Sequence, residues 1–142
     1  MRNEVNAKKR ILEIYKKSNI FINTNEIAKM EITDFGLEDF FNIGLGIIIY
    51  VNTKRVSAKE LAMTPFQICP QHRHPDISGY PGKEETFRCR WGEVYLNIEG
   101  DKTAKPMSAI PKKYRKRFDV FHEIVLKPGD QYTLPPNTWH WF

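Results

Sequence analysis

Two histidines separated by a single residue constrain the fold more than any other feature of this sequence. They are His72 and His74, and Glu85 and a third histidine, His140, follow them along the chain. Alternate side chains of a β-strand point to the same face, whereas a helix would splay two such imidazoles apart. The pattern therefore favours a strand that carries both imidazoles to one point. Together the four residues are typical of the ligand set of one divalent metal ion.

Length and composition fit one globular domain. A chain of 142 residues with ordinary apolar and charged content can bury a core without disulfides or metals as staples. Residues 1–17 are charged and hold no long apolar stretch, so we expect neither a secretory signal nor a membrane span, and a cytoplasmic protein. Two cysteines, Cys69 and Cys89, are too few for a disulfide framework. We expect them to be reduced packing residues rather than metal ligands.

The formal charge of +5 raises the question of a nucleic-acid partner, because Lys112-Lys113-Tyr114-Arg115-Lys116-Arg117 lies in the second half of the chain. No recognition helix and no aromatic RNA-binding signature accompanies this run. A solvated loop is therefore the favoured interpretation, and we expect no nucleic-acid partner. A third interpretation, in which some of these cations lie near a pocket mouth and attract an anionic substrate, stays open.

The hydrophobic pattern changes along the chain from helical to extended. Val5 to Lys17 is rich in helix formers, and Asn23 followed by Glu26 is typical of a capping box that begins a second helix. From Leu45 to Val51 the residues alternate and many are β-branched. Further strands are expected at residues 58–64, 83–90, 93–99, 119–127 and 131–134. This predicts a mainly β domain, with a helical segment over about residues 1–40 and a sandwich or barrel over about 41–142.

Strand alternation also assigns side chains to faces. Lys59 shares its side with the apolar residues two and four positions later, so we expect it to point inward. Lys83 and Glu85 share a side with the apolar residues that follow, whereas Glu84 takes the other side, which favours Glu85 as the ligand. His122 also falls on an apolar side and becomes a candidate pocket residue.

The ligand spacing resembles the first of two motifs of the cupin superfamily. That motif runs Gly, five residues, His-X-His, a spacer, Glu, six residues, Gly, and His72, His74, Glu85 and Gly92 fit it. Two departures occur: Phe66 stands in place of the leading glycine, and ten residues form the spacer, which contains enough proline and glycine to loop out.

The second cupin motif runs Gly, five residues, Pro-X-Gly, two residues, His. Gly129, Pro135, Asn137 and His140 match it. Asparagine is the best substitute for glycine where the backbone must be left-handed. The resemblance implies a cupin-type β-barrel (a double-stranded β-helix or jelly roll) in a single domain, residues 1–142, with N-terminal helices.

Longer stretches resemble the D-lyxose isomerase family of cupins. They are Lys59-Glu60-Leu61, Cys69-Pro70-Gln71-His72-Arg73-His74-Pro75, residues 82–92 from Gly82 to Gly92, Val94-Tyr95-Leu96 and residues 135–142 from Pro135 to Phe142. The resemblance covers most of the chain beyond about Tyr50. It implies a manganese-dependent, homodimeric isomerase that interconverts D-lyxose with D-xylulose and, often, D-mannose with D-fructose.

The chemistry of the expected site agrees with this activity. Three imidazoles and one carboxylate leave two positions of an octahedral shell open, which suits Mn²⁺ or Fe²⁺, with Co²⁺ and Zn²⁺ as alternatives. An open-chain aldose can present two adjacent oxygens to such an ion, and its isomerisation proceeds through an enediolate. A residue must also move a proton between the two carbons. Lys59 is the catalytic candidate, and Lys83 and His122 are the substrate-binding candidates.

Other functions of the same ligand set stay open. An iron-dependent cupin dioxygenase would use the same residues to bind Fe²⁺ and O₂, and a non-catalytic sugar-binding or regulatory cupin would bind sugar without turnover. Members of the resembled family continue beyond the last metal histidine with a further strand. A truncated form, whose barrel would have an exposed edge, and a genuine short C-terminus, which would favour the non-catalytic interpretation, both stay open for the sequence ending at Phe142.

Overall fold

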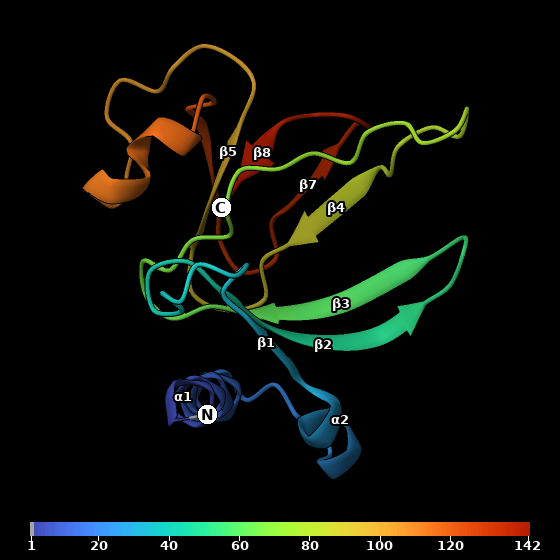
Figure 1. Cartoon of the computed structure of the whole chain (residues 1–142), viewed down its shortest axis with the longest axis vertical. Helices are drawn as coiled ribbons and strands as arrows, with labels where there is room; N and C mark the ends of the chain where they lie inside the picture. Colours follow the sequence, from blue (N-terminus) through green and yellow to red (C-terminus); the bar gives the residue numbers. More distant parts are fainter. Residues whose placement is uncertain (1) are drawn as a thin grey trace. The chain divides into compact units, whose positions relative to one another are not determined.

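The structure is a computed structural model that describes residues 2–142, with side chains described from residue 4 onward. The chain forms two compact units, Met1–Cys69 and Pro70–Phe142, and each is described by itself (Figure 1). Within the described residues, no helix is both long enough and apolar enough to cross a membrane.

The first unit begins with two helices, as predicted. Helix α1 spans Arg2–Ser18, and α2 spans Thr24–Lys29. The capping box of α2 is confirmed: the Asn23 side chain accepts a hydrogen bond from the Glu26 backbone, and the Glu26 carboxylate accepts one from the Asn23 backbone. Two orphan N–H groups at the helix start are thereby satisfied.

One face of α1 is buried against a three-stranded antiparallel sheet (Figure 1). The strands are β1 (Glu31–Thr33), β2 (Leu45–Asn52) and β3 (Ser57–Ala62), in the order β1-β2-β3. The buried helix residues are Ala7, Ile11 and Tyr15, four positions apart, and they pack with sheet residues such as Ile48 and Ala62. Gly46 in β2 lets the helix approach, because a Cβ at this position would overlap Ile11.

The second unit contains two small antiparallel sheets. One pairs β4 (Glu85–Arg88) with β7 (Gln131–Leu134), and the other has the order β6-β5-β8, formed by β6 (His122–Leu126), β5 (Val94–Ile98) and β8 (His140–Trp141). The core of this unit holds fully buried side chains, among them Leu96, Leu134 and Trp141. Two segments far apart in sequence, β4 and β7, thus become neighbours through the sheet.

The predicted fold class is confirmed as mainly β with N-terminal helices. Every predicted strand has a counterpart, although most are shorter than expected, and the sequence pattern missed the short strands β1 and β8. The strands of the described residues form three hydrogen-bonded sheets. Closure into a cupin-type barrel and the single-domain organisation stay predictions.

The basic run differs from the expected loop. Lys112–Arg117 forms a 3-10 helix, η1, and its Tyr114 side chain is buried while the neighbouring cations are exposed. The aromatic ring anchors the segment, and the charged side chains stay in water. This agrees with a solvated surface but corrects its local structure.

The two motif positions where glycine is replaced keep the left-handed backbone of glycine. Asn137 has φ 62° and Phe66 has φ 61°. Asparagine visits this region at small cost, whereas phenylalanine does so at a cost of about 1 kcal/mol. The backbone conformation of the motif is therefore retained at both positions even though the residue type is not.

Candidate metal centre

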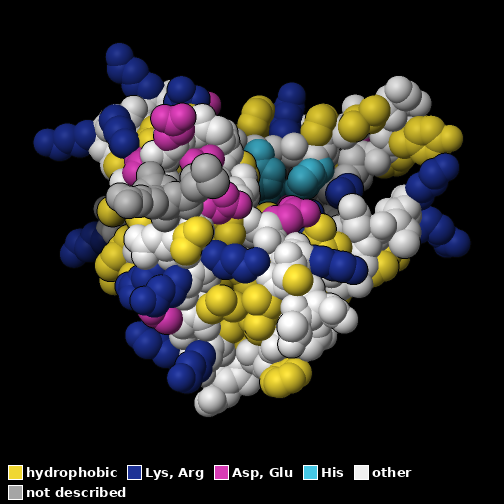
Figure 2. All heavy atoms as spheres, turned by 60° about the horizontal axis from the view of Figure 1, so that its bottom comes forward, with side chains coloured by type: hydrophobic (Ala, Val, Ile, Leu, Met, Phe, Trp, Pro, Cys, Tyr) yellow, Lys and Arg dark blue, Asp and Glu magenta, His cyan; other side chains and the backbone are white. Residues whose placement is uncertain are grey.

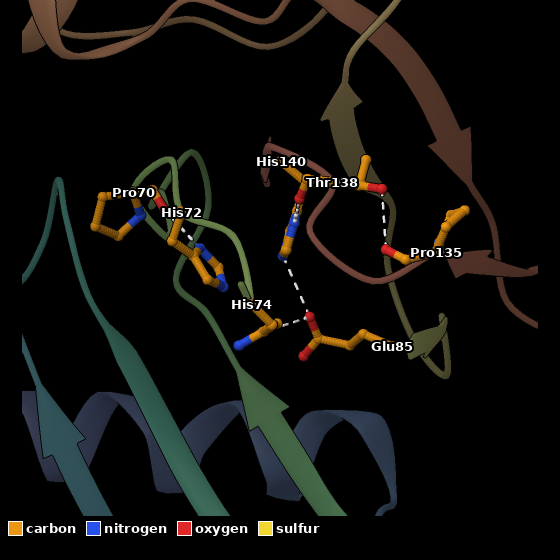
Figure 3. Close-up of polar contacts among 7 residues, drawn as sticks. All are labelled: Pro70, His72, His74, Glu85, Pro135, Thr138 and His140. Atoms are coloured by element: carbon orange, nitrogen blue, oxygen red, sulfur yellow. Dashed lines mark hydrogen bonds and ion pairs between the residues drawn. The ribbon is translucent and has the colours of Figure 1, made fainter. Parts of the chain in front are cut away.

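The structure brings the four predicted ligands of the second unit together. His72, His74, Glu85 and His140 each offer one ligand atom, and these atoms all lie within 4.8 Å of one another. Figure 3 shows the three imidazoles turned toward the Glu85 carboxylate from separate parts of the chain. Histidine side chains are also visible on the surface beside an acidic side chain (Figure 2).

Backbone pairing fixes the positions of the histidines. The His72 N–H donates to the His140 carbonyl oxygen (2.9 Å), and the His140 N–H donates to the His72 carbonyl oxygen (3.0 Å). The Asn137 N–H donates to the carbonyl oxygen of His74 (3.0 Å), so the left-handed residue of the motif closes the same pairing. Residues 72–74 form no regular strand: His72 makes an isolated antiparallel bridge with His140, and this pairing and the bond to His74 place the two imidazoles.

Two backbone carbonyls select the tautomers of two histidines. His72 Nδ1 lies 2.9 Å from the carbonyl oxygen of Pro70, and His140 Nδ1 lies 2.9 Å from that of Thr138 (Figure 3). A carbonyl oxygen can only accept, so each Nδ1 carries the proton and each Nε2 keeps its lone pair. Metal-binding histidines are commonly oriented in this way by a hydrogen bond to the other ring nitrogen.

Glu85 projects from the first residue of β4 into this group. Its Oε2 lies 3.0 Å from Nε2 of His74 and 3.2 Å from Nε2 of His140. Along β4 the side chains of Glu85 and Phe87 are half-buried, whereas the residues between and after them are exposed. Glu84 is exposed and precedes the strand. The structure thus places Glu85, and not Glu84, among the histidines.

The electrostatics of the group lower the pKa of two of its members, His72 and Glu85. Burial lowers the pKa of His72, and the nearby His140 and His74 act in the same direction, against the opposing effects of the Pro70 carbonyl and Glu85. Burial would raise the pKa of Glu85, but its contacts with the three histidines outweigh that effect and hold its pKa below the usual value. Neutral imidazole and ionised carboxylate are the ligand forms.

His140 is the most deeply buried member of the group. The residue is 1% exposed, and its Nε2 atom has no hydrogen-bond partner among the described residues, although Glu85 lies within ion-pair distance. An unsatisfied buried nitrogen is costly unless another group binds it. The Phe87 ring, 5.7 Å from the His140 ring between centroids, and Phe142 beyond it form an apolar wall on one side.

Lys59 differs from its expected placement. It lies on β3 in the first unit and is exposed, whereas its neighbours Glu60 and Ala62 are buried. The reason is that α1 covers the face to which Ala62 points, while the face of Lys59 and Leu61 is not covered by that helix. Alternating apolar residues occur on both faces of this strand, so parity alone does not decide which face is buried. The catalytic role of Lys59 stays a prediction.

The two other candidates lie in the second unit outside the ligand group. Lys83 is exposed and precedes β4, which corrects its expected place inside that strand. His122 on β6 is half-buried, and its Nδ1 lies 2.9 Å from the Asp101 carbonyl oxygen. His122 and His140 flank Ile98 in neighbouring strands, so they share one row of the sheet, about 10 Å apart. Their substrate-binding roles stay predictions.

Both cysteines are buried and neither forms a disulfide, as the sequence predicts. Burial raises the pKa of the Cys89 thiol, and neither cysteine belongs to a cluster of possible metal ligands within the described residues. A buried thiol with a raised pKa is a poor nucleophile and a poor ligand. This agrees with a packing role for Cys89.

Sequence patterns missed the groups that orient the ligands. Pro70 and Thr138 act through backbone carbonyls, which every residue possesses and which leave no mark in a sequence. Each carbonyl belongs to the residue two positions before its histidine. That regular spacing indicates an orienting hydrogen bond only once the backbone conformation around both histidines is known.

No protein-family model matches the chain. Curated proteins match it over nearly its whole length. "D-lyxose ketol-isomerase" of Thermofilum sp. (strain ex4484_79) is 54% identical over 136 residues, which cover 96% of this chain and 76% of the relative. "D-lyxose/D-mannose isomerase" of Thermosediminibacter oceani is 53% identical over 133 residues (94% and 74%), and "D-lyxose ketol-isomerase" of Cohnella laeviribosi is 49% identical over 136 residues (96% and 75%). Identity of this level over this length confirms the resemblance: the chain belongs to the D-lyxose ketol-isomerase family.

Proposed function

We propose that this protein is a metal-dependent aldose–ketose isomerase that interconverts D-lyxose with D-xylulose and also D-mannose with D-fructose. The observation that carries the proposal is the convergence of His72, His74, Glu85 and His140 on one point. The names of the relatives supply the sugars, since two are called D-lyxose ketol-isomerases and one a D-lyxose/D-mannose isomerase.

The residues present fit a divalent ion. Ligand atoms that share an ion at about 2.0–2.2 Å lie within about 4.4 Å of one another, so the observed limit of 4.8 Å requires only small shifts. The buried Nε2 of His140, which lacks a hydrogen-bond partner among the described residues, would be satisfied by such an ion. The tautomers of His72 and His140 already present their Nε2 lone pairs.

Three nitrogens and one carboxylate oxygen suit Mn²⁺, the ion that we propose, and Fe²⁺, Co²⁺ and Zn²⁺ are the alternatives. When bound, the ion would supply a Lewis acid that polarises the sugar carbonyl and offsets the negative charge that develops when C2 loses its proton. The protein would contribute the orientation of the ligands through the Pro70 and Thr138 carbonyls. The negative charge of Glu85 would partly neutralise the positive charge of the bound ion.

The proton must still pass between C1 and C2 of the sugar. Lys59 is the proposed proton-transfer residue, and Lys83 and His122 are the proposed sugar-binding residues; these roles depend on the family resemblance. A proton-transfer residue lowers kcat on substitution while metal affinity is kept. Lys59→Met should therefore lower kcat by about 100-fold with unchanged Mn²⁺ affinity, and an unchanged kcat would assign the step to another residue.

The activity is tested with protein stripped by chelator and reloaded with Mn²⁺. Incubation with D-lyxose should produce D-xylulose, and incubation with D-mannose should produce D-fructose, each measured by chromatography. The stripped protein serves as the control and should produce neither ketose. Ketose absent from a preparation that holds one Mn²⁺ per chain would contradict the proposed activity.

Assembly is a separate part of the proposal. The family resemblance implies a homodimer in the cytoplasm. Light scattering coupled to size exclusion would measure the mass directly, and a value near twice 16.7 kDa is expected. A mass of one chain at the protein concentration of the activity measurement would contradict the dimer without affecting the proposed chemistry.

A further inference from the structure

Two residues that are not ligands connect the candidate metal centre to one short segment. Gln71 directly precedes His72, and Trp141 directly follows His140. Both side chains bind residues 118–120, the segment between η1 and β6, which we call the brace. The brace itself offers no ligand atom to the centre.

Gln71 binds the brace through a single oxygen. Its Oε1 accepts hydrogen bonds from the backbone N–H groups of Asp119 (2.6 Å) and Val120 (3.2 Å). The partners are 48 and 49 positions away in sequence. Because both donors belong to the backbone, the contact is insensitive to the side chains of the brace and fixes where the chain just before His72 runs.

Trp141 binds the brace from the other histidine. Its Nε1–H donates to the carbonyl oxygen of Val120 (2.7 Å), and its ring packs edge-on against Phe118 with centroids 5.0 Å apart. Trp141 is 1% exposed and Phe118 is 5% exposed. The indole is thus held by one directed bond and one buried ring contact, which together leave it little freedom.

These contacts close a ring around the backbone of two ligands. His72 and His140 bind each other through two backbone hydrogen bonds, and Gln71 and Trp141 bind opposite groups of the same residue, the N–H and the carbonyl oxygen of Val120. A movement of either histidine backbone away from the other would strain their mutual hydrogen bonds and the contacts of Gln71 and Trp141 to the brace. Groups outside the ligand set thus add to the constraint on the separation of these two ligands.

We propose that Gln71 and Trp141 are positioning residues of the metal centre, which hold His72 and His140 at the separation required to share one ion. The proposal rests on the metal dependence proposed above. Partners that orient metal ligands typically change metal affinity by about 10–100-fold when they are removed. A purely structural role predicts instead a loss of stability in the metal-free protein without a specific effect on affinity.

The test compares three glutamine variants. Gln71→Met removes the acceptor and keeps the side-chain length, and Gln71→Glu keeps an acceptor. Gln131→Met removes a matched acceptor, which accepts a hydrogen bond from the exposed Arg88 side chain (3.3 Å). Mn²⁺ affinity is measured by competition with a chelator, and the absorption spectrum of the Co²⁺-loaded protein reports ligand geometry. Apo melting is recorded for each protein, and binding is measured below the lowest melting midpoint.

We expect Gln71→Met to weaken Mn²⁺ binding by about tenfold or more and to shift the Co²⁺ spectrum. Gln71→Glu and Gln131→Met should stay within about threefold of the wild type with an unshifted spectrum. Wild-type affinity and spectrum in Gln71→Met, or an equal loss in Gln131→Met, would overturn the proposal. An equal loss in Gln71→Glu would also overturn it, because the acceptor is present there.

Trp141→Phe provides an independent variant that removes the indole donor and keeps an aromatic ring. It should weaken Mn²⁺ binding by about tenfold with the same direction of spectral shift, and an unchanged affinity would contradict the role of Trp141. A wild-type protein that binds no Mn²⁺ would refute the metal centre as well. If the wild type binds one ion and all variants have the same affinity, only the positioning roles of Gln71 and Trp141 are refuted.

Discussion

The apolar cluster beneath α1 in the first unit and His140 in the ligand group of the second unit are both buried, but different interactions surround them. In the first unit the interior consists of apolar side chains, such as Ala7, Ile11 and Ile48, which gain stability by leaving water. In the second unit His140 is equally inaccessible, yet its Nε2 atom finds no hydrogen bond within the described residues. The first cluster is held by apolar contacts, whereas the second gathers polar ligand atoms that face one another.

This difference separates the residues that stabilise the fold from the residues proposed to bind the metal ion. An apolar cluster is stable without any ligand, whereas three imidazoles within a few ångströms of one another repel once two of them are protonated. A cluster of titratable groups of this kind is therefore a candidate binding site. The predictions below change one region and measure the response of the other.

The largest effect is expected from loss of a ligand. His74→Ala should weaken Mn²⁺ binding by at least about 100-fold, because one of four ligand atoms is removed and Glu85 loses its 3.0 Å partner. Metal content per chain after dialysis measures this. His122→Ala is the matched control, since it removes the one histidine outside the group, and its metal content should equal that of the wild type. Full metal content in His74→Ala would contradict the assignment.

Metal removal should affect the two regions unequally. A ligand present at 100 times its Kd stabilises the state that binds it by about 2.7 kcal/mol. Chelation should therefore speed amide hydrogen exchange around residues 72–74 and 140–141, while exchange in α1 and β2 changes little. Mass spectrometry of peptides from both regions reports this directly. Equal acceleration in α1 would show that the two regions are not independent.

A substitution in the core of the first unit should lower stability without changing metal affinity. Gly46→Ala places a Cβ against the fully buried Ile11, and overpacking of this kind costs about 1–3 kcal/mol. Urea unfolding should show this loss, while Mn²⁺ affinity of the folded protein should match the wild type. A weakened affinity together with unchanged stability would contradict the separation of roles.

The smallest effect is expected at Phe66, whose φ of 61° is unfavourable for its side chain. Because the residue is 75% exposed, little packing is lost on substitution. Phe66→Gly should raise the free energy of unfolding by about 1 kcal/mol, since glycine adopts this conformation without strain. Asn137→Gly is the matched control and should be nearly neutral. Destabilisation by Phe66→Gly would show that the exposed ring has a packing role.

The ligand group could be predicted because two short motifs carry it. The His-X-His pair and Glu85 fit the first motif and His140 fits the second, and the alternating burial of β4 begins at Glu85. The capping box at Asn23 was predictable for the same reason, since both partners lie within one turn. Each of these inferences needs only the period of the local structure.

Other features could not be predicted because they depend on what covers a surface or on the backbone of distant residues. Lys59 lies on a strand with apolar residues on both faces, and only the packing of α1 decides which face is buried. The brace contacts of Gln71 join residues 48 and 49 positions apart through backbone groups. The anchoring of η1 by Tyr114 likewise depends on its surroundings.

The central claim is that one ion bound by His72, His74, Glu85 and His140 is required for sugar isomerisation. The most direct test titrates Mn²⁺ into stripped protein and follows both bound metal and the rate of D-xylulose formation from D-lyxose. The rate should rise in proportion to bound metal and reach its limit at one ion per chain. A full rate in protein that holds no metal, or a rate of zero at one ion per chain, would contradict the claim.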